Sequence, residues 1–99
     1  MRVISKKQIQ DFCQAHPEAQ APLMAWYKKV KAASWQNISE VKQTFPHADG
    51  VGSCTVFNAG GNKYRLITRI MYPYYTVYIR FVLSHAEYDL ARWKSDCQK

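Results

Sequence analysis

Acidic residues are missing from a long central stretch of this 99-residue sequence. Residues 50–86 contain no Asp or Glu, although Lys63, Arg65, Arg69 and Arg80 all lie there. The whole chain carries 14 Lys and Arg against 7 Asp and Glu, which gives a formal net charge of +7. A basic chain with so little local counter-charge favours nucleic acid or another polyanion as a partner, and a basic protein that is merely soluble is the alternative.

Cysteines are few and scattered. Cys13, Cys54 and Cys97 have no CxxC spacing, and an odd, isolated set argues against both a disulfide framework and a zinc site. No apolar run approaches the 18 residues of a membrane span, and the polar N-terminal segment lacks the pattern of a signal peptide. We therefore expect a cytoplasmic protein that binds no metal and no cofactor.

The length and the apolar content of 47% predict one globular domain over all 99 residues. In the first half, apolar residues at helical spacing predict three helices. The first is capped by Ser5 and ends before Pro17, and the second covers about residues 21–33. The third begins after Asn37, in a capping-box pattern, and stops at Pro46.

The second half predicts three β-strands at residues 54–59, 62–72 and 75–83. Two tight turns join them, at Gly60-Gly61 and at Pro73-Tyr74. The glycine pair supplies the positive φ angles that a two-residue hairpin loop demands. We therefore expect consecutive antiparallel strands in one sheet.

These elements predict an α+β domain. Its antiparallel sheet consists of the three C-terminal strands and a candidate short strand at residues 2–4, with helices covering one face. A capping box from Ser84 to Glu87 begins a C-terminal helix, which we expect to extend to about Lys94.

Two-residue turns would fix which side chains share a face of the sheet, because directly opposed residues point the same way. In this register Asn58 lies opposite Lys63. An apolar face for the helices to cover then consists of Phe57, Tyr64, Leu66, Ile70, Val77, Ile79, Phe81 and Leu83. The opposite face is polar and consists of Asn58, Lys63, Arg65, Arg69, Tyr78 and Arg80.

The polar face combines cations with an aromatic ring. A guanidinium group binds phosphate with two parallel hydrogen bonds, and a tyrosine ring can stack on an unpaired base. Single-stranded RNA is therefore the expected ligand. The residues predicted to bind it are Asn58, Asn62, Arg69 and Tyr78.

His85 is the best candidate for proton transfer. It follows the last strand, in the first turn of the final helix, at the rim of the cationic face. A neutral histidine there could take the proton of a 2′-hydroxyl group, and Tyr88, one turn later, is a second candidate. Other interpretations stay open: His85 as an ordinary polar residue and Tyr88 as part of the core. Asp89 either orients the imidazole or pairs with Arg92.

The remaining histidines carry less information. His16 lies at a helix end and His47 in a loop, and structural or solvent-exposed roles explain both. The sequence contains no HExxH, P-loop, GxSxG or paired-carboxylate pattern.

Two segments resemble a known family. FNAGGNKYRLI at residues 57–67 and YIRFVLSHAEYD at 78–89 are similar to HigB toxins with the pattern N-x-GGN-x-YRL … YIR-x-V-x-TH-x-EYD, with Ser84 in place of the threonine. HigB belongs to the RelE/ParE superfamily of type II toxin–antitoxin modules. The resemblance implies a small RelE-like fold and metal-free cleavage of mRNA, often on the translating ribosome. It also implies neutralisation by a HigA-like antitoxin with a helix-turn-helix domain.

The resemblance also identifies candidate catalytic positions. The residues that match its motifs are Lys63, Arg65, Arg80, His85 and Tyr88. From the chemistry of RNA cleavage we expect the two arginines to hold the scissile phosphate and stabilise its extra charge, with assistance from the lysine. The histidine or the tyrosine would move protons, and attack by the internal 2′-hydroxyl would leave a 2′,3′-cyclic phosphate. The alternative is a basic RNA- or ribosome-binding protein without catalytic activity.

Overall fold

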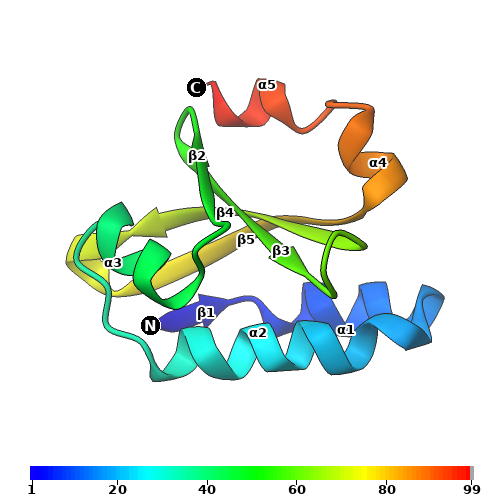
Figure 1. Ribbon diagram of the computed structural model, residues 1–99, viewed down its shortest axis with the longest axis horizontal. Helices are drawn as coiled ribbons and strands as arrows, with labels where there is room; N and C mark the ends of the chain where they lie inside the picture. The colour runs from blue at the N-terminus through cyan, green and yellow to red at the C-terminus, as the bar shows by residue number, and fades with distance from the viewer. Residues whose placement is uncertain (99) are drawn as a thin grey trace.

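The computed structural model of the protein describes residues 1–98. Its centre is a five-stranded sheet with the order β1-β5-β4-β3-β2 (Figure 1). The strands are β1 (Arg2–Ile4), β2 (Asp49–Val51), β3 (Cys54–Ala59), β4 (Tyr64–Met71) and β5 (Thr76–Ser84). The α+β class is confirmed. The sheet is mixed, however, because β1 lies parallel to β5, and β2 is an additional strand that the sequence did not predict.

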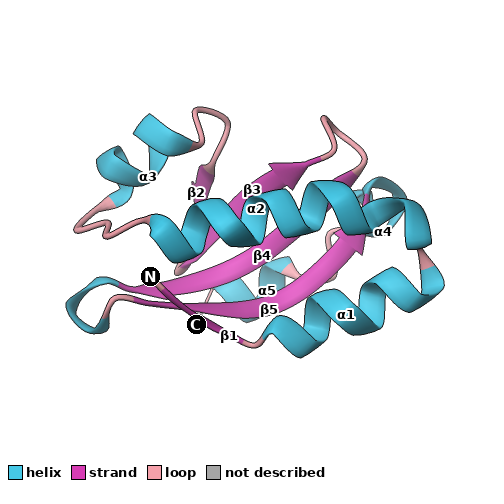
Figure 2. Ribbon diagram, turned by 90° about the horizontal axis from the view of Figure 1, so that it is seen from below, coloured by secondary structure: helices cyan, strands magenta, loops and turns pink. Residues whose placement is uncertain are grey.

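Three helices cover one face of the sheet (Figure 2). They are α1 (Lys6–Ala15), α2 (Gln20–Ala32) and α3 (Ile38–Thr44), with a 3-10 turn η1 (Pro17–Ala19) between the first two. Their bounds agree closely with the sequence prediction. Asn37 caps α3, because its side chain accepts a hydrogen bond from the Glu40 backbone N–H at 3.0 Å. The Ser5 side chain, in contrast, makes no capping hydrogen bond to α1. None of the helices in residues 1–98 is long and apolar enough to cross a membrane.

The main core lies between these helices and the sheet. An aromatic cluster at its centre surrounds Phe57 of β3, with the rings of Trp26, Trp35 and Phe45 at centroid distances of 5.4, 6.1 and 5.1 Å. Each large side chain buried in this way contributes roughly 1.5–3 kcal/mol to folding. This cluster therefore fixes α2 and α3 against β3.

The β3–β4 hairpin differs in register from the prediction. Asn58 pairs with Arg65, where Lys63 was expected. The loop has four residues, 60–63, and its two glycines adopt φ angles of +62° and +67°. The register shift is two residues, and side chains alternate with a period of two, so each residue stays on its predicted face.

A β-bulge interrupts the pairing of β4 with β5. Thr68 faces Ile79 as predicted, but the next pair is Ile67 with Phe81, which leaves Arg80 without a residue opposite it. Beyond a bulge the alternation of side chains along the strand is reversed. No glycine or other local signal in β5 marks this position.

The bulge changes which side chains join the main core. Val82 packs against the helix-covered core, whereas Leu83 packs on the opposite face, and Phe81 is exposed. The prediction that Phe81 and Leu83 lie under the helices is therefore wrong. The opposite face gains an apolar surface of its own.

The C-terminal segment covers part of this second face (Figure 1). The single helix predicted from Ser84 to Lys94 is instead two short helices, α4 (His85–Asp89) and α5 (Lys94–Cys97), separated by a turn in which Ala91 has a φ of +58°. The segment folds back over the sheet and forms a second apolar cluster there. The cluster contains Cys54, Val56, Ile67, Trp93 and Cys97, with Val51, Leu83 and Tyr88 packed against them.

A disulfide between Cys54 and Cys97 closes this arrangement, which corrects the prediction of unpaired cysteines. The Ser53 backbone N–H and hydroxyl both donate to the Cys97 carbonyl, at 2.7 and 3.0 Å. Gly52, with a φ of +58°, lies so close that a Cβ there would be 2.1 Å from the same carbonyl oxygen. The two cysteines are 43 residues apart, so no local spacing could reveal the pair.

We expect Cys97→Ser to lower the free energy of unfolding by about 2–4 kcal/mol, because the disulfide restricts the unfolded chain. Urea denaturation would measure the change. The control is Cys13→Ser, which removes the free thiol and leaves the disulfide intact. Thiol titration of the unfolded, unreduced protein should detect Cys13 alone, and detection of all three thiols would contradict the pairing.

Candidate active site

Four of the five predicted catalytic residues lie together, where β4 begins and β5 continues into α4. The His85 backbone N–H donates to the Lys63 carbonyl at 2.9 Å. Two residues after Lys63, the guanidinium carbon of Arg65 lies 4.9 Å from the centre of the Tyr88 ring. The hairpin and the first turn of α4 thus bring these side chains to one end of the sheet.

Arg65 is a nearly buried cation, with only 9% of its surface exposed. Its Nη1 donates to the carbonyls of Asn62 and Tyr64, at 3.0 and 3.2 Å. Within residues 1–98 no carboxylate pairs with it. A guanidinium has five N–H donors, so Nε and Nη2 stay available. A desolvated cation without a counter-charge is costly, and an anionic ligand would relieve that cost.

His85 is held by the helix that it begins. Ser84 and Glu87 form the predicted capping box, with hydrogen bonds of 3.3 and 3.0 Å between the side chain of each and the backbone N–H of the other. One turn later, the Asp89 carboxylate lies 2.9 Å from Nδ1 of His85. Of the two partners considered for Asp89, the imidazole is therefore the one that it contacts. This contact leaves Nε2 free on a side chain that is 52% exposed.

Tyr88 packs as the structural interpretation expected. Its ring stacks on Trp93 with a centroid distance of 5.0 Å and an interplanar angle of 15°, and the Trp93 indole N–H donates to the Tyr88 carbonyl at 3.0 Å. The ring also contacts the Arg65 guanidinium. A catalytic role for the hydroxyl stays a prediction.

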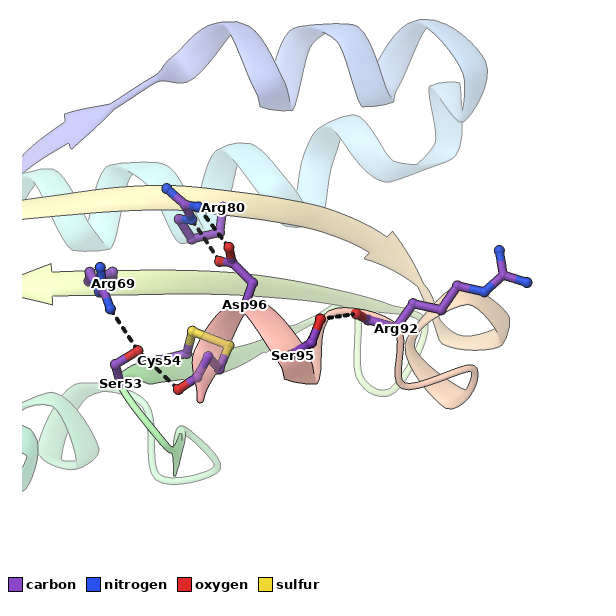
Figure 3. A network of polar contacts seen from close by, with 8 residues as sticks. Ser53, Cys54, Arg69, Arg80, Arg92, Ser95 and Asp96 are labelled. Atoms are coloured by element: carbon purple, nitrogen blue, oxygen red, sulfur yellow. Dashed lines mark hydrogen bonds and ion pairs between the residues drawn. A yellow bond between two sulfur atoms is a disulfide. The ribbon is translucent and has the colours of Figure 1, made fainter. Parts of the chain in front are cut away.

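Arg80 does not join this group. Its Nε and Nη2 donate to the two carboxylate oxygens of Asp96, both at 2.9 Å, and these hydrogen bonds raise the pKa of Arg80 (Figure 3). The expected cationic face without counter-charge is therefore wrong at this position, because α5 supplies an acidic partner. The prediction rested on residues 50–86, which contain no acidic residue, whereas Asp96 lies outside that stretch near the end of the chain.

Arg69 and Tyr78 form a directly opposed pair toward the other end of β4. Arg69 lies four residues beyond Arg65, about 13 Å along an extended strand. Its Nη2 donates to the Ser53 hydroxyl at 2.9 Å (Figure 3), and Tyr78 is exposed. This pair could contact RNA only at a distance from the candidate active site.

Asn58 and Asn62 lie on the hairpin and line a cleft of about 490 Å³. Its other walls come from α2 and from the segment that follows α3, with Lys29, Phe45 and His47. Lys29 and Phe45 were not predicted as site residues, and His47 was assigned a structural or solvent-exposed role. They are distant from the hairpin in sequence and match no motif, so only the packing of α2 and α3 against β3 reveals them.

Tyr64 points away from the candidate active site. Its hydroxyl donates to a carboxylate oxygen of Glu18 at 3.2 Å. Burial and this carboxylate together raise the pKa of Tyr64. Tyr64 therefore belongs to the main core and is not a proton donor at the site.

We expect neutral His85 to carry its proton on Nδ1, because an oxygen of the Asp89 carboxylate lies 2.9 Å from that nitrogen and can only accept. Two-bond ¹H–¹⁵N correlation spectra distinguish the two tautomers. Asp89→Ala should shift the population toward the Nε2–H form, which free imidazole side chains favour. His47, which contacts no carboxylate in residues 1–98, is the internal control. An Nδ1 without a proton in the unsubstituted protein would contradict the prediction.

Comparison with known proteins identifies the family to which this chain belongs. The model of the HigB toxin family, described as the RelE-like toxic component of a toxin–antitoxin system, matches residues 19–91. The mRNA interferase toxin HigB of Escherichia coli K12 is 28% identical over 92 residues, which cover 90% of this chain and 88% of that protein. The mRNA interferases HigB of E. coli O157:H7 and Shigella flexneri show the same identity and coverage. The chain belongs to the HigB family of RelE-like toxins.

Proposed function

We propose that this protein is an endoribonuclease that cleaves mRNA by attack of a 2′-hydroxyl on the adjacent phosphate. The observation that carries the proposal is the nearly buried Arg65, which has no carboxylate partner within residues 1–98, at the same end of the sheet as His85, whose backbone N–H donates to the Lys63 carbonyl. Arg65 supplies a site for an anionic phosphate, and His85 supplies a free imidazole nitrogen. The similar proteins named mRNA interferases support mRNA as the substrate.

In the proposed reaction the imidazole accepts the 2′-hydroxyl proton at Nε2. The 2′-oxygen forms a bond to phosphorus, and the bond from phosphorus to the 5′-oxygen breaks. The free N–H donors of Arg65 stabilise the charge that develops on the phosphoryl oxygens. Lys63 or the Tyr88 hydroxyl protonates the leaving 5′-oxygen. The products are a 2′,3′-cyclic phosphate and a 5′-hydroxyl.

Asp89 is a positioning residue in this scheme. It holds Nδ1 and so directs Nε2 outward, and it stabilises the imidazolium that forms when the proton arrives. Both side chains are largely exposed, so the pair contributes little to folding stability. The role of the pair in this scheme is to orient the His85 imidazole ring.

We also propose the partner that this family description implies. A toxin of a toxin–antitoxin system needs a neutralising protein, and a HigA-like helix-turn-helix antitoxin is the expected one. The net charge of +7 favours an acidic surface on that protein. Cleavage on the translating ribosome belongs to the same proposal.

His85→Ala should lower the rate of RNA cleavage by about 10²- to 10⁴-fold, the usual contribution of a general base. RNA affinity should change little, since the ring is exposed and carries no part of the phosphate site. Single-turnover cleavage and fluorescence anisotropy measure the two quantities. His16→Gln, whose ring stacks on Phe12 of α1 on the helix-covered side of the sheet, is the matched control. Equal losses of affinity and rate would mark His85 as a binding residue instead.

Arg80 and Asp96 provide a paired test of the second arginine. We expect Arg80→Ala to reduce RNA affinity and cleavage, whereas Asp96→Asn, which removes only the competing charge, should preserve or increase both. Thermal denaturation separates this outcome from a purely structural role. If Arg80 serves only to hold α5, the two variants will lose similar stability and neither will change RNA binding.

Cleavage of naked RNA should survive EDTA and leave a 2′,3′-cyclic phosphate. The reason is that the proposed steps use side chains alone, and residues 1–98 gather no group of three or more His, Cys, Asp or Glu that could hold a metal. Mass spectrometry of the fragments identifies the product ends. A 3′-hydroxyl end, or activity that returns only with added divalent ions, would overturn the prediction.

A further inference from the structure

We propose that the cleft between α2 and the β3–β4 hairpin binds one nucleotide of single-stranded RNA adjacent to the cleaved phosphate. Lys29 and His47 at its rim would be binding residues of the enzyme. The proposal rests on the proposed function and adds a substrate-recognition site to it.

The cleft has the size and lining that a nucleotide needs. Its volume is about 490 Å³, and a neighbouring hollow of about 240 Å³ shares Lys29, Phe45 and Asn58 with it. Small-molecule sites typically occupy about 300–1,000 Å³. Both spaces are formed from separate parts of the fold, which the aromatic cluster around Phe57 holds in place.

The cleft adjoins the candidate active site through one hairpin. Asn58 is the residue directly opposite Arg65, and the carbonyl of Asn62 accepts a hydrogen bond from the Arg65 guanidinium. Both asparagines also line the cleft. An RNA strand with its phosphate at Arg65 would therefore place a neighbouring nucleotide beside this hairpin.

The chemistry of the lining favours a ligand that is anionic and rich in hydrogen-bond acceptors. Lys29 contributes a cation, with Nζ 5.7 Å from the Phe45 ring centre, and no Asp or Glu is among the described residues that line either space. The side-chain amides of Asn58 and Asn62 can read the edge of an unpaired base. The rings of Phe45 and His47 offer faces on which a base can stack.

An unpaired donor next to the smaller hollow also supports a ligand there. The Trp26 indole N–H has no acceptor within the described chain, although the side chain is only 2% exposed. The other two indoles are paired, Trp35 with Thr44 at 3.3 Å and Trp93 with Tyr88 at 3.0 Å. Buried donors nearly always have a partner. Trp26 lines the smaller hollow, so a base bound there would change the surroundings of this indole.

The test compares two adjacent lysines of α2. Lys29 lines the cleft, whereas Lys28 is exposed and does not. The probe is a fluorescein-labelled 2′-O-methyl RNA 12-mer of mixed sequence, which has no free 2′-hydroxyl to react. Lys29→Gln should raise the dissociation constant about 5- to 10-fold and reduce the slope of log affinity against log salt by about 0.7. Lys28→Gln should change the affinity much less.

A second measurement reports on the cleft directly. In ¹H–¹⁵N spectra, adding the same RNA should shift the Trp26 indole resonance more than those of Trp35 and Trp93, with assignments from single Trp→Phe variants. Equal effects of the two lysine variants and an unmoved Trp26 resonance would overturn the proposal. A resonance that shifts only when the antitoxin binds would also overturn it, because the cleft would then be a protein-binding surface.

The outcomes separate this inference from the proposed function. If the unsubstituted protein cleaves RNA, and Lys29→Gln and His47→Ala cleave it equally well with the same base preference, the cleft proposal is wrong and the endoribonuclease proposal stands. If RNA shifts the Trp26 resonance and depends on Lys29 for affinity, but no cleavage occurs, the cleft proposal stands and the enzyme proposal fails.

Discussion

The bulge at Arg80 in β5 is the constraint on which the second face of the sheet depends. If β5 paired with β4 without a bulge, Leu83 would point under the helices and Val82 would take its place on the opposite face. Trp93 and Tyr88 of the C-terminal segment pack on that surface, and Tyr88 in turn contacts Arg65. One unpaired residue in a strand thus determines the surroundings of the proposed phosphate site.

Arg80 and Arg65, two cations on the face of the sheet that the C-terminal segment covers, differ in whether a carboxylate pairs with them. Arg80 meets Asp96 of α5 in a doubly hydrogen-bonded ion pair, so its charge is already balanced. Within residues 1–98 Arg65 contacts two backbone carbonyls and the Tyr88 ring, so its charge is not balanced by a carboxylate there. Because a desolvated cation gains most from an incoming anion, we propose Arg65 as the main phosphate ligand of the two. Net charge alone could not make this distinction.

The short β2 strand shapes the other proposed part of the RNA site. It pairs with β3 only as far as Val56, so residues 57–59 lie at an open edge of the sheet. The cleft lies beside that edge, between α2, the segment after α3 and the hairpin. A longer β2 would occupy this space, and the hairpin asparagines would then face another strand instead of a cleft.

The sequence by itself determined the features that depend on neighbouring residues. The positions of α1 to α3 followed from apolar spacing, and those of β3 to β5 from strands bounded by turns. The caps at Asn37 and Ser84 followed from their motifs, and the placement of Arg65 from a period of two that tolerates a register shift of two residues. Tertiary structure alone decided the Arg80 bulge, the Cys54–Cys97 disulfide, the contact with Asp96 and the cleft at Lys29. These features join segments that are far apart in the chain, and such contacts form only when the packing of the whole fold brings the segments together.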